Sequence, residues 1–198
     1  VIMGYFNQIK SFLTSSNGII TRKQLIALNI PTIYLTRLVD SGELTRIDRG
    51  IYIDSTGDYD EQYFFQQKYS VAIYSYVSAL VFHDMTDVIP QDLEVTVYKG
   101  YNTSRMPSNV RVHYVSKEIH ELGVTTVKTI FGNSVKAYNK ERTICDLIKH
   151  RAEMESEIFA KAIHCYVKSK DKDLYRLHAY AQKMKISQKV DDIMTLFI

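Results

Sequence analysis

The sequence predicts an α+β protein in which a small N-terminal domain, residues 1–57, precedes a larger domain, residues 58–198. Apolar residues recur at helical spacing up to residue 41, and two short runs with strand-like alternation follow. Turn-forming residues at 55–58 then separate this part from the rest of the chain. The content of 45% hydrophobic and 24% charged residues is that of a folded globular chain rather than a disordered one.

Three helices are expected before residue 42. The first has its apolar residues on one face and ends at Asn17-Gly18, a pair that tolerates left-handed backbone. Thr21 is a suitable N-cap for a second helix over residues 22–28. After a break at Asn29-Ile30-Pro31, a third helix covers residues 32–41.

After Gly42 the apolar period changes from that of a helix to that of a strand. Residues 44–47 and 51–53 are predicted to be strands, joined by the three-residue loop Asp48-Arg49-Gly50 with glycine where φ must be positive. Helix, helix, tight turn, helix and hairpin is the order of a winged helix-turn-helix, which we predict for residues 1–57.

The C-terminal domain is expected to combine a small β-sheet with a helical C-terminal segment. Helical stretches are predicted at 59–68 and around 78–83, and strands at 93–98, 110–115, 124–131 and 135–138. The terminal helices are predicted to begin at the caps Asn139, Asp171 and Ser187, with one more helix around residues 158–167. Cys145 and Cys165 lie in helix-like surroundings and are expected to be reduced thiols.

In a winged helix-turn-helix the third helix lies in the major groove, where its N-terminal residues contact base edges. Apolar spacing places Tyr34, Leu35, Leu38 and Val39 toward the core. The candidate base-contacting residues on the outward side are Thr32, Ile33, Thr36 and Arg37. Arg37 is the best candidate for a guanine contact, because a guanidinium can bond both O6 and N7.

Two further groups are candidates for contact with the DNA backbone. Thr21, Arg22 and Lys23 stand at the start of the second helix, where they suit a phosphate oxygen. Arg46 and Arg49 lie on the hairpin, and Arg49 at the tip is placed to follow the backbone or enter the minor groove. The alternative, that these are ordinary solvated charges, stays open.

The sequence carries no recognisable catalytic or metal-binding motif. It lacks HExxH, CxxC, GxSxG and a glycine-rich phosphate loop, so we expect no catalytic residue, no metal and no cofactor. Asp92 and Glu94 precede a strand, but Lys99 lies too far along it for the usual spacing of a metal-dependent nuclease. His83 is expected to be a hydrogen-bonded histidine at a helix end.

Glu141, Arg142 and Asp146 form the most chemical-looking cluster, within ERTICD. Arg142 and Asp146 are i,i+4 partners, and we expect this pair to tie a helix to the neighbouring sheet.

Charge is distributed unevenly along the chain. Residues 1–57 hold six Lys and Arg against four Asp and Glu, residues 58–135 hold six against nine, and residues 136–198 hold thirteen against nine. The basic C-terminal segment could be a second DNA or partner surface, although a solvated helix face with charge pairs explains it equally well.

Three blocks, GELTRIDRGIY (42–52), SALVFH (78–83) and ERTICDLIKHR (141–151), resemble the AbiEi-type antitoxins of bacterial abortive-infection systems. The similarity spans nearly the whole chain. One departure is Asp84, which stands where relatives often carry glycine after the second block.

The resemblance implies a transcriptional autorepressor that binds double-stranded DNA at inverted repeats in its own promoter, with two copies on the operator. It also implies a C-terminal domain that counteracts a co-expressed nucleotidyltransferase toxin in a type IV toxin–antitoxin system for phage resistance. In such systems antitoxin and toxin form no stable complex. The chain has no apolar stretch long enough for a membrane helix and no secretory-type start, so we expect a cytoplasmic protein that is not an enzyme.

Two other functions compete with this interpretation. The C-terminal half could be a nucleic-acid-processing enzyme targeted by the winged helix, with Asp92, Glu94, Glu141 and Asp146 as its acids. It could also be a protein-binding module that clamps a partner.

Overall fold

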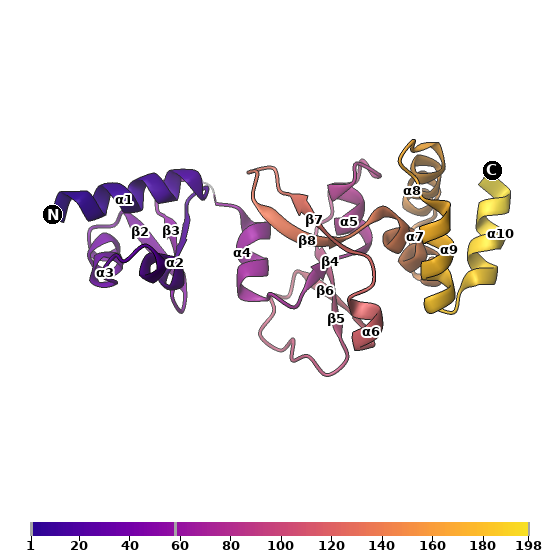
Figure 1. Cartoon of the computed structure of the whole chain (residues 1–198), viewed down its shortest axis with the longest axis horizontal. Coiled ribbons are helices and arrows are strands. Elements are labelled where there is room, and N and C mark those ends of the chain that lie inside the picture. The colour runs from indigo at the N-terminus through magenta and orange to yellow at the C-terminus, as the bar shows by residue number, and fades with distance from the viewer. Residues whose placement is uncertain (1, 58, 198) are drawn as a thin grey trace. The chain divides into compact units, whose positions relative to one another are not determined.

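The computed structural model describes residues 2–57 and 59–197 and confirms the α+β fold (Figure 1). The described chain forms two compact units. The N-terminal unit runs to Lys68 and also contains Lys128–Ser134, while the C-terminal unit comprises Tyr69–Val127 and the chain from Val135 onward. The domain boundary near residue 57 stays a prediction, and residue 58 of the expected linker lies outside the described residues.

The N-terminal unit contains the predicted winged helix-turn-helix. Its elements are α1 (Ile2–Ser15), β1 (Ile19–Thr21), α2 (Arg22–Ala27), α3 (Ile33–Asp40), β2 (Leu44–Asp48), β3 (Ile51–Asp54) and α4 (Glu61–Lys68). The strands form an antiparallel sheet in the order β1-β3-β2. Strand β1 was not predicted, because three residues are too few to show a period and their pairing with β3 is a non-local contact.

Local backbone chemistry sets the ends of these helices. The chain leaves α1 through Asn17 and Gly18, with φ of 53° and 82°, as predicted. Thr21 caps α2 as predicted, since its Oγ1 accepts a hydrogen bond from Gln24 N at 3.1 Å. In return Gln24 Oε1 accepts from Thr21 N at 2.8 Å, which completes a capping box.

The predicted three-residue hairpin loop is wrong by one residue. Asp48 pairs with Ile51, which leaves Arg49 and Gly50 as the turn. The register shifts between Arg46 and Asp48, so Ile47 is the extra residue of a bulge in β2, and Asp48 pairs within the strand instead of lying in the loop. Gly50 has the expected positive φ, 76°.

The tip of a distant hairpin completes the N-terminal unit. Asp60 is buried, and its carboxylate accepts hydrogen bonds from Thr129 Oγ1, from Asn133 Nδ2 at 3.0 Å and from Tyr63 N at 3.0 Å. Asn17 Nδ2 donates to the carbonyl of Phe131. Residues 128–134 are therefore part of this unit although they lie far along the chain.

The C-terminal unit combines a five-stranded sheet with helices. Its strands are β4 (Ile73–Tyr74), β5 (Leu93–Tyr98), β6 (Val110–Val115), β7 (Val124–Lys128) and β8 (Ser134–Tyr138), in the order β6-β5-β4-β8-β7. The β4–β5 pair is antiparallel, whereas β5–β6 and β4–β8 are parallel. Strands β5, β6 and β8 match the prediction within a residue, whereas β7 ends at 128 rather than 131 because residues 130–132 turn back toward β8.

Most helices of this unit come from the last sixty residues of the chain. They are α5 (Tyr76–Phe82), α6 (Lys117–His120), α7 (Lys140–Lys149), α8 (Ser156–Lys168), α9 (Leu174–Lys183) and α10 (Ser187–Phe197), with a 3-10 turn at Arg151–Glu153. Helices α7 to α10 lie side by side (Figure 1) and bury one apolar core together with α5. Cys145 is buried in this core and Cys165 is half-buried, and both are free thiols.

One predicted helix cap is wrong. Helix α9 is capped by Asp173, whose Oδ1 accepts from Arg176 N at 2.9 Å. The carboxylate of Asp171, the predicted cap, is instead bound by Lys140 Nζ at 2.8 Å and by the Ser169 hydroxyl.

The turn after α5 gives Asp84 a left-handed conformation, with φ of 54°. Its N–H donates to Val81 O at 3.2 Å, which closes the end of the helix. Glycine is the residue that adopts this φ without steric cost, and aspartate is one of the few others that tolerate it. The departure from the family pattern therefore preserves the turn.

Candidate nucleic-acid interface

Helix α3 exposes the residues that were predicted to face DNA. Thr36 and Arg37 are exposed, Ile33 is 51% exposed, and Thr32 is half-buried. The opposite face carries Tyr34, Leu35 and Leu38, which are buried as expected.

Aromatic contacts hold α3 against α1. The ring of Tyr34 packs edge-on against Phe6, with 5.2 Å between centroids, and lies 5.3 Å from the ring of Tyr5. The guanidinium of Arg37 lies 5.2 Å from the centroid of the same Tyr34 ring. Arg37 thus lies next to a packed aromatic cluster, and its side chain stays exposed.

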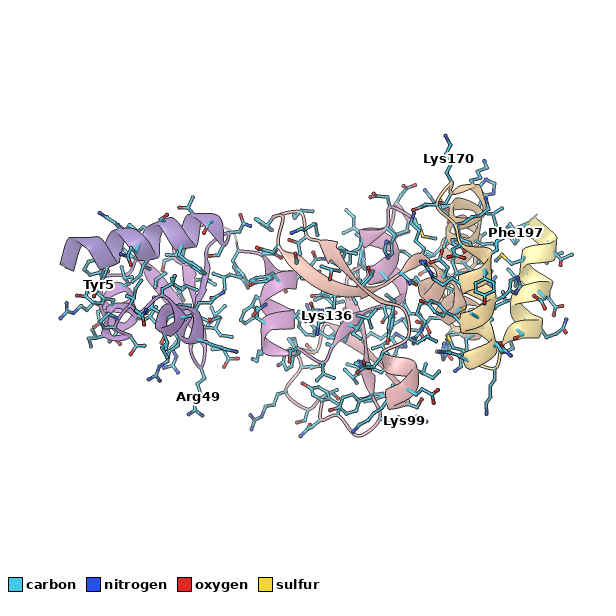
Figure 2. The ribbon with its side chains drawn as sticks, in the orientation of Figure 1. Tyr5, Arg49, Lys99, Lys136, Lys170 and Phe197 are labelled. Atoms are coloured by element: carbon cyan, nitrogen blue, oxygen red, sulfur yellow. The ribbon has the colours of Figure 1, made fainter. Side chains whose placement is uncertain are left out.

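The start of α2 and the hairpin tip lie next to each other. Arg22 N donates to Gly50 O at 2.7 Å, and a Cβ built on Gly50 would lie 3.5 Å from the Arg22 Cβ. Arg22, Arg46 and Arg49 are all exposed, and Figure 2 shows Arg49 projecting from the hairpin tip. The structure therefore brings two of the predicted phosphate-contacting groups together, whereas Arg37 stands on a separate helix. Lys23, beside Arg22, is also exposed.

The second predicted cluster centres on the fully buried guanidinium of Arg142. Its Nε lies 3.1 Å from both carboxylate oxygens of Asp146, the predicted i,i+4 partner. Its Nη1 donates to the carbonyls of Ile119 and, at 2.6 Å, of Leu122. The guanidinium also lies 4.0 Å from the centroid of the Tyr138 ring. One side chain of α7 therefore links this helix to the segment after α6 and to β8.

Gly123 makes room for this arginine. It has a φ of 79°, and a Cβ at this position would lie 2.5 Å from the Cβ of Arg142, too close for any other residue without a backbone shift. Among the described residues, Nη2 of Arg142 has no hydrogen-bond partner.

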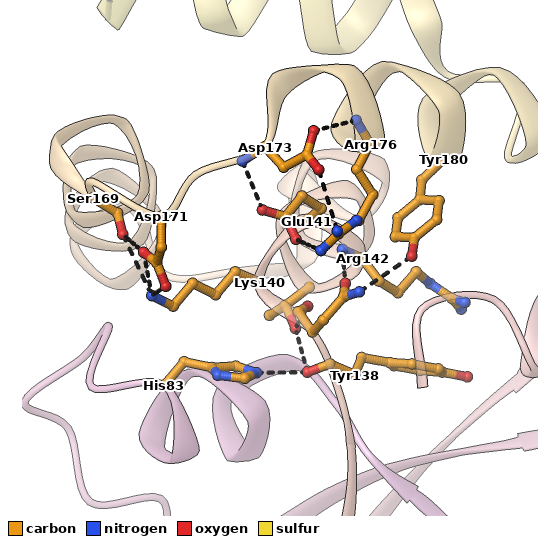
Figure 3. A network of polar contacts seen from close by, with 12 residues as sticks. His83, Tyr138, Lys140, Glu141, Arg142, Ser169, Asp171, Asp173, Arg176 and Tyr180 are labelled. Carbon is orange, nitrogen blue, oxygen red and sulfur yellow. Dashed lines mark hydrogen bonds and ion pairs between the residues drawn. The ribbon is translucent and has the colours of Figure 1, made fainter. Parts of the chain in front are cut away.

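Glu141, the neighbour of Arg142, is also buried and joins α7 to α9 (Figure 3). Its Oε1 accepts from Asp173 N at 3.1 Å and from Tyr166 OH at 3.3 Å. Arg176 Nη1 lies 3.6 Å from its other oxygen. These contacts satisfy the carboxylate within the fold.

Two histidines are held by backbone carbonyls. His83 ends α5, and its Nε2 lies 2.7 Å from Tyr138 O (Figure 3), which is the environment expected from the sequence. His120 Nε2 lies 3.0 Å from Val71 O. Burial lowers the pKa of both imidazoles, because desolvation disfavours the charged form.

The acids proposed for an enzyme have separate surroundings. Asp92 is exposed, whereas Glu94 lies on β5 with its Oε2 2.9 Å from His113 Nε2. Glu141 and Asp146 serve the buried contacts described above. Within the part of the chain that the structure describes, no three or more His, Cys, Asp or Glu side chains are grouped so that they could hold a metal ion.

A polar cavity of about 380 Å³ lies beside Glu94 in the C-terminal unit. The phenol of Tyr76 lies 2.9 Å from His150 Nδ1, and its ring stacks on His113 at 3.8 Å between centroids. Tyr76 has a φ of 49°, a rare conformation for an aromatic residue. Sequence reasoning missed this group because its members come from α5, β5, β6 and the end of α7 without a shared local motif.

Several cations of the basic C-terminal segment have partners within the unit. Arg176 pairs with Glu141 and Asp173, and Lys161 pairs with Asp87. These contacts support the interpretation of this surface as a solvated helix face with charge pairs. Among residues 2–57 and 59–197, none of the helices is both long enough and apolar enough to cross a membrane.

The Arg142–Asp146 pair yields a stability prediction. Replacing Asp146 with Asn leaves the guanidinium buried without its counter-charge, and we expect a loss of about 3–5 kcal/mol in the free energy of unfolding. Urea denaturation followed by circular dichroism measures this loss. Arg142→Met combined with Asp146→Leu removes both charges and should cost less than Asp146→Asn alone; an equal or larger cost would contradict the assigned role of the pair.

The buried histidines yield a pH prediction. Their folded-state pKa values lie below the unfolded value of about 6.5, so the unfolded chain binds more protons as the pH falls below that value. The stability is therefore fully present above about pH 6.5 and declines at lower pH. Thermal unfolding between about pH 7.5 and pH 5.5 should show a falling Tm, with a shallower slope in His83→Gln. The exposed His164 provides the control, since His164→Gln should keep the original slope; an unchanged slope in His83→Gln would be inconsistent with the prediction.

Comparison with known proteins agrees with the winged-helix geometry. Residues 7–53 match the family model described as "Transcriptional regulator, AbiEi antitoxin". No curated protein matches the chain. Among solved structures, the crystal structure of the RV2827C protein from Mycobacterium tuberculosis has a similar fold, with a TM-score of 0.57, 12% identity, and coverage of 90% of this chain and 71% of that chain.

At this identity the structural likeness shows the fold alone. The match over residues 7–53 covers α2, α3 and the hairpin, and it confirms the resemblance drawn from the sequence for this segment. The blocks at residues 78–83 and 141–151 lie outside the matched residues. Over residues 7–53 the chain is similar to the AbiEi antitoxin family of transcriptional regulators.

Proposed function

We propose that the chain represses its own operon by binding inverted repeats in the promoter, with two copies on the operator. We further propose that residues 58–198 counteract a nucleotidyltransferase toxin made from the same operon, in a type IV arrangement without a stable antitoxin–toxin complex. In this proposal the protein acts in the cytoplasm and takes part in abortive infection, which confers phage resistance. The observation that carries this proposal is the exposed cationic surface of α2, α3 and the hairpin within the matched segment.

The residues of this surface take different roles in the proposal. Arg37, with Thr32, Ile33 and Thr36, reads base edges in the major groove, where an arginine can bond guanine O6 and N7. The backbone-contacting residues are Thr21, Arg22, Lys23, Arg46 and Arg49. Phosphate contacts position the protein without specifying sequence, so the two groups should respond differently to substitution.

The proposal is for a protein without catalytic turnover, in keeping with the regulator family. The acids named for an enzyme are engaged in the fold or exposed singly, and no observation favours catalysis by them.

Promoter binding tests the roles of the two arginines. Arg37→Ala should weaken binding to the native promoter by about 1–3 kcal/mol, roughly fivefold to more than a hundredfold, and relax specificity at one base pair. Arg49→Ala should weaken binding to all sequences alike and lower the slope of log affinity against log salt by about 1. Gel shifts at several salt concentrations measure both effects.

The exposed Arg105 of the C-terminal unit provides a charge-matched control, and Arg105→Ala should bind the promoter like the unmodified chain. If neither Arg37→Ala nor Arg49→Ala changes affinity, the assigned surface is wrong.

Repression and toxin neutralisation should separate by substitution. A chain with both Arg37→Ala and Arg49→Ala should lose repression of a promoter reporter but still rescue cells that express the toxin, because the altered residues are exposed and lie outside residues 58–198. Reporter activity and cell survival are measured in the same strain, with circular dichroism as the check on folding. Loss of rescue by a folded double variant would show that neutralisation requires DNA binding.

A further inference from the structure

An acidic residue lies inside the cationic hairpin. Asp48 ends β2, directly before the tip residue Arg49. Its Oδ1 accepts a hydrogen bond from Arg49 N at 2.6 Å, and its Oδ2 lies 2.5 Å from Lys68 Nζ. Its backbone carbonyl accepts from Arg46 Nε at 3.1 Å. One residue thus contacts both hairpin arginines and a lysine from another element.

Such a carboxylate is unfavourable beside DNA on electrostatic grounds alone. The bond with Lys68 and the hydrogen bond from Arg49 N keep the pKa of Asp48 below its usual value, so the group is ionised at neutral pH. A negative charge next to a phosphate-binding surface repels the DNA backbone. Its presence in the hairpin is explained if the order it imposes outweighs that repulsion.

The hairpin turn at Arg49 and Gly50 is the segment that the Asp48 carboxylate can order. The register of β2 shifts between Arg46 and Asp48, and Gly50 turns the chain with a positive φ. The tip residues Arg49 and Gly50 therefore follow an irregular part of the β2–β3 pairing. The Asp48 carboxylate fixes the amide of Arg49, and Lys68 fixes the carboxylate in turn.

Lys68 lies outside the winged helix-turn-helix domain that the sequence predicts. It is the last residue of α4, beyond both the predicted domain, residues 1–57, and the matched segment, residues 7–53. Its side chain is 34% exposed and that of Asp48 is 29% exposed, so the pair is partly shielded from water. Both residues belong to the N-terminal unit.

We propose that Asp48 and Lys68 are positioning residues that hold the hairpin tip in its DNA-binding arrangement, so that the DNA-binding element extends through α4 to Lys68. This inference rests on the proposed function of the hairpin. It assigns neither residue a contact with DNA. Their effect passes through the backbone at Arg49.

The sign of one affinity change separates this role from plain electrostatics. Asp48→Ala removes a negative charge, which by itself strengthens DNA binding. Loss of the ordered hairpin tip weakens DNA binding instead. We expect the full-length variant to bind a native promoter fragment about threefold to tenfold more weakly. Fluorescence anisotropy measures the Kd. Glu61→Ala, which removes one exposed negative charge from the other end of α4, supplies the electrostatic baseline and should bind equally or more tightly.

Lys68→Met completes a double-mutant cycle. Because the lysine acts through the aspartate, the double variant Asp48→Ala, Lys68→Met should bind about as weakly as Asp48→Ala alone. Tighter binding by Asp48→Ala, or independent additive losses from the two substitutions, would overturn the proposal.

Limited trypsin digestion tests the ordering of the tip without DNA. Cleavage after Arg49, followed by mass spectrometry, should be faster in Asp48→Ala and Lys68→Met than in Glu61→Ala or the unmodified chain. Unchanged cleavage rates would refute the positioning role whether or not the chain binds the promoter. Accelerated cleavage in a chain that binds no promoter DNA would instead remove the proposed function and, with it, the role in DNA binding.

Discussion

The C-terminal unit depends on a guanidinium that has been taken completely out of water. Arg142 stays charged in this setting because Asp146 faces its Nε and two backbone carbonyls accept from its Nη1. Such a charge is costly to bury, and its partners must be in place before the surrounding chain can pack. Helix α7, the loop at Gly123 and strand β8 are therefore fixed relative to one another by one side chain. The apolar core of α7 to α10 is built on this fixed frame.

The winged helix within the N-terminal unit is organised mainly by short-range chemistry instead. A capping box begins α2, left-handed residues end α1 and α3, and a glycine turns the hairpin. The aromatic ring of Tyr34 then seats α3 on α1, which presents the opposite face to solvent. The surface that we propose for DNA binding thus follows from how this small core packs.

What could be predicted from the sequence follows the same division. The winged helix, most strands and the exposed face of α3 were predicted correctly, because caps, turns and apolar periods are local signals. Strand β1 and the bulge between Arg46 and Asp48 were missed, since both exist only through pairing with β3. The cap of α9 was placed at Asp171 rather than Asp173 because Lys140, distant in sequence, engages Asp171. The groups around Tyr76 and the partner of Asp48 are likewise products of tertiary contact.

The tip of the β7–β8 hairpin has a consequence for modularity. Residues 128–134 belong to the N-terminal unit, and they supply Thr129 and Asn133 to the buried carboxylate of Asp60. The polypeptide consequently passes between the units three times rather than once. A recombination event that exchanged only residues 1–68 for those of a relative would separate Thr129 and Asn133 from the Asp60 carboxylate to which they donate. The first 68 residues are thus not a self-contained cassette, and we expect their exchange alone to lower the free energy of unfolding.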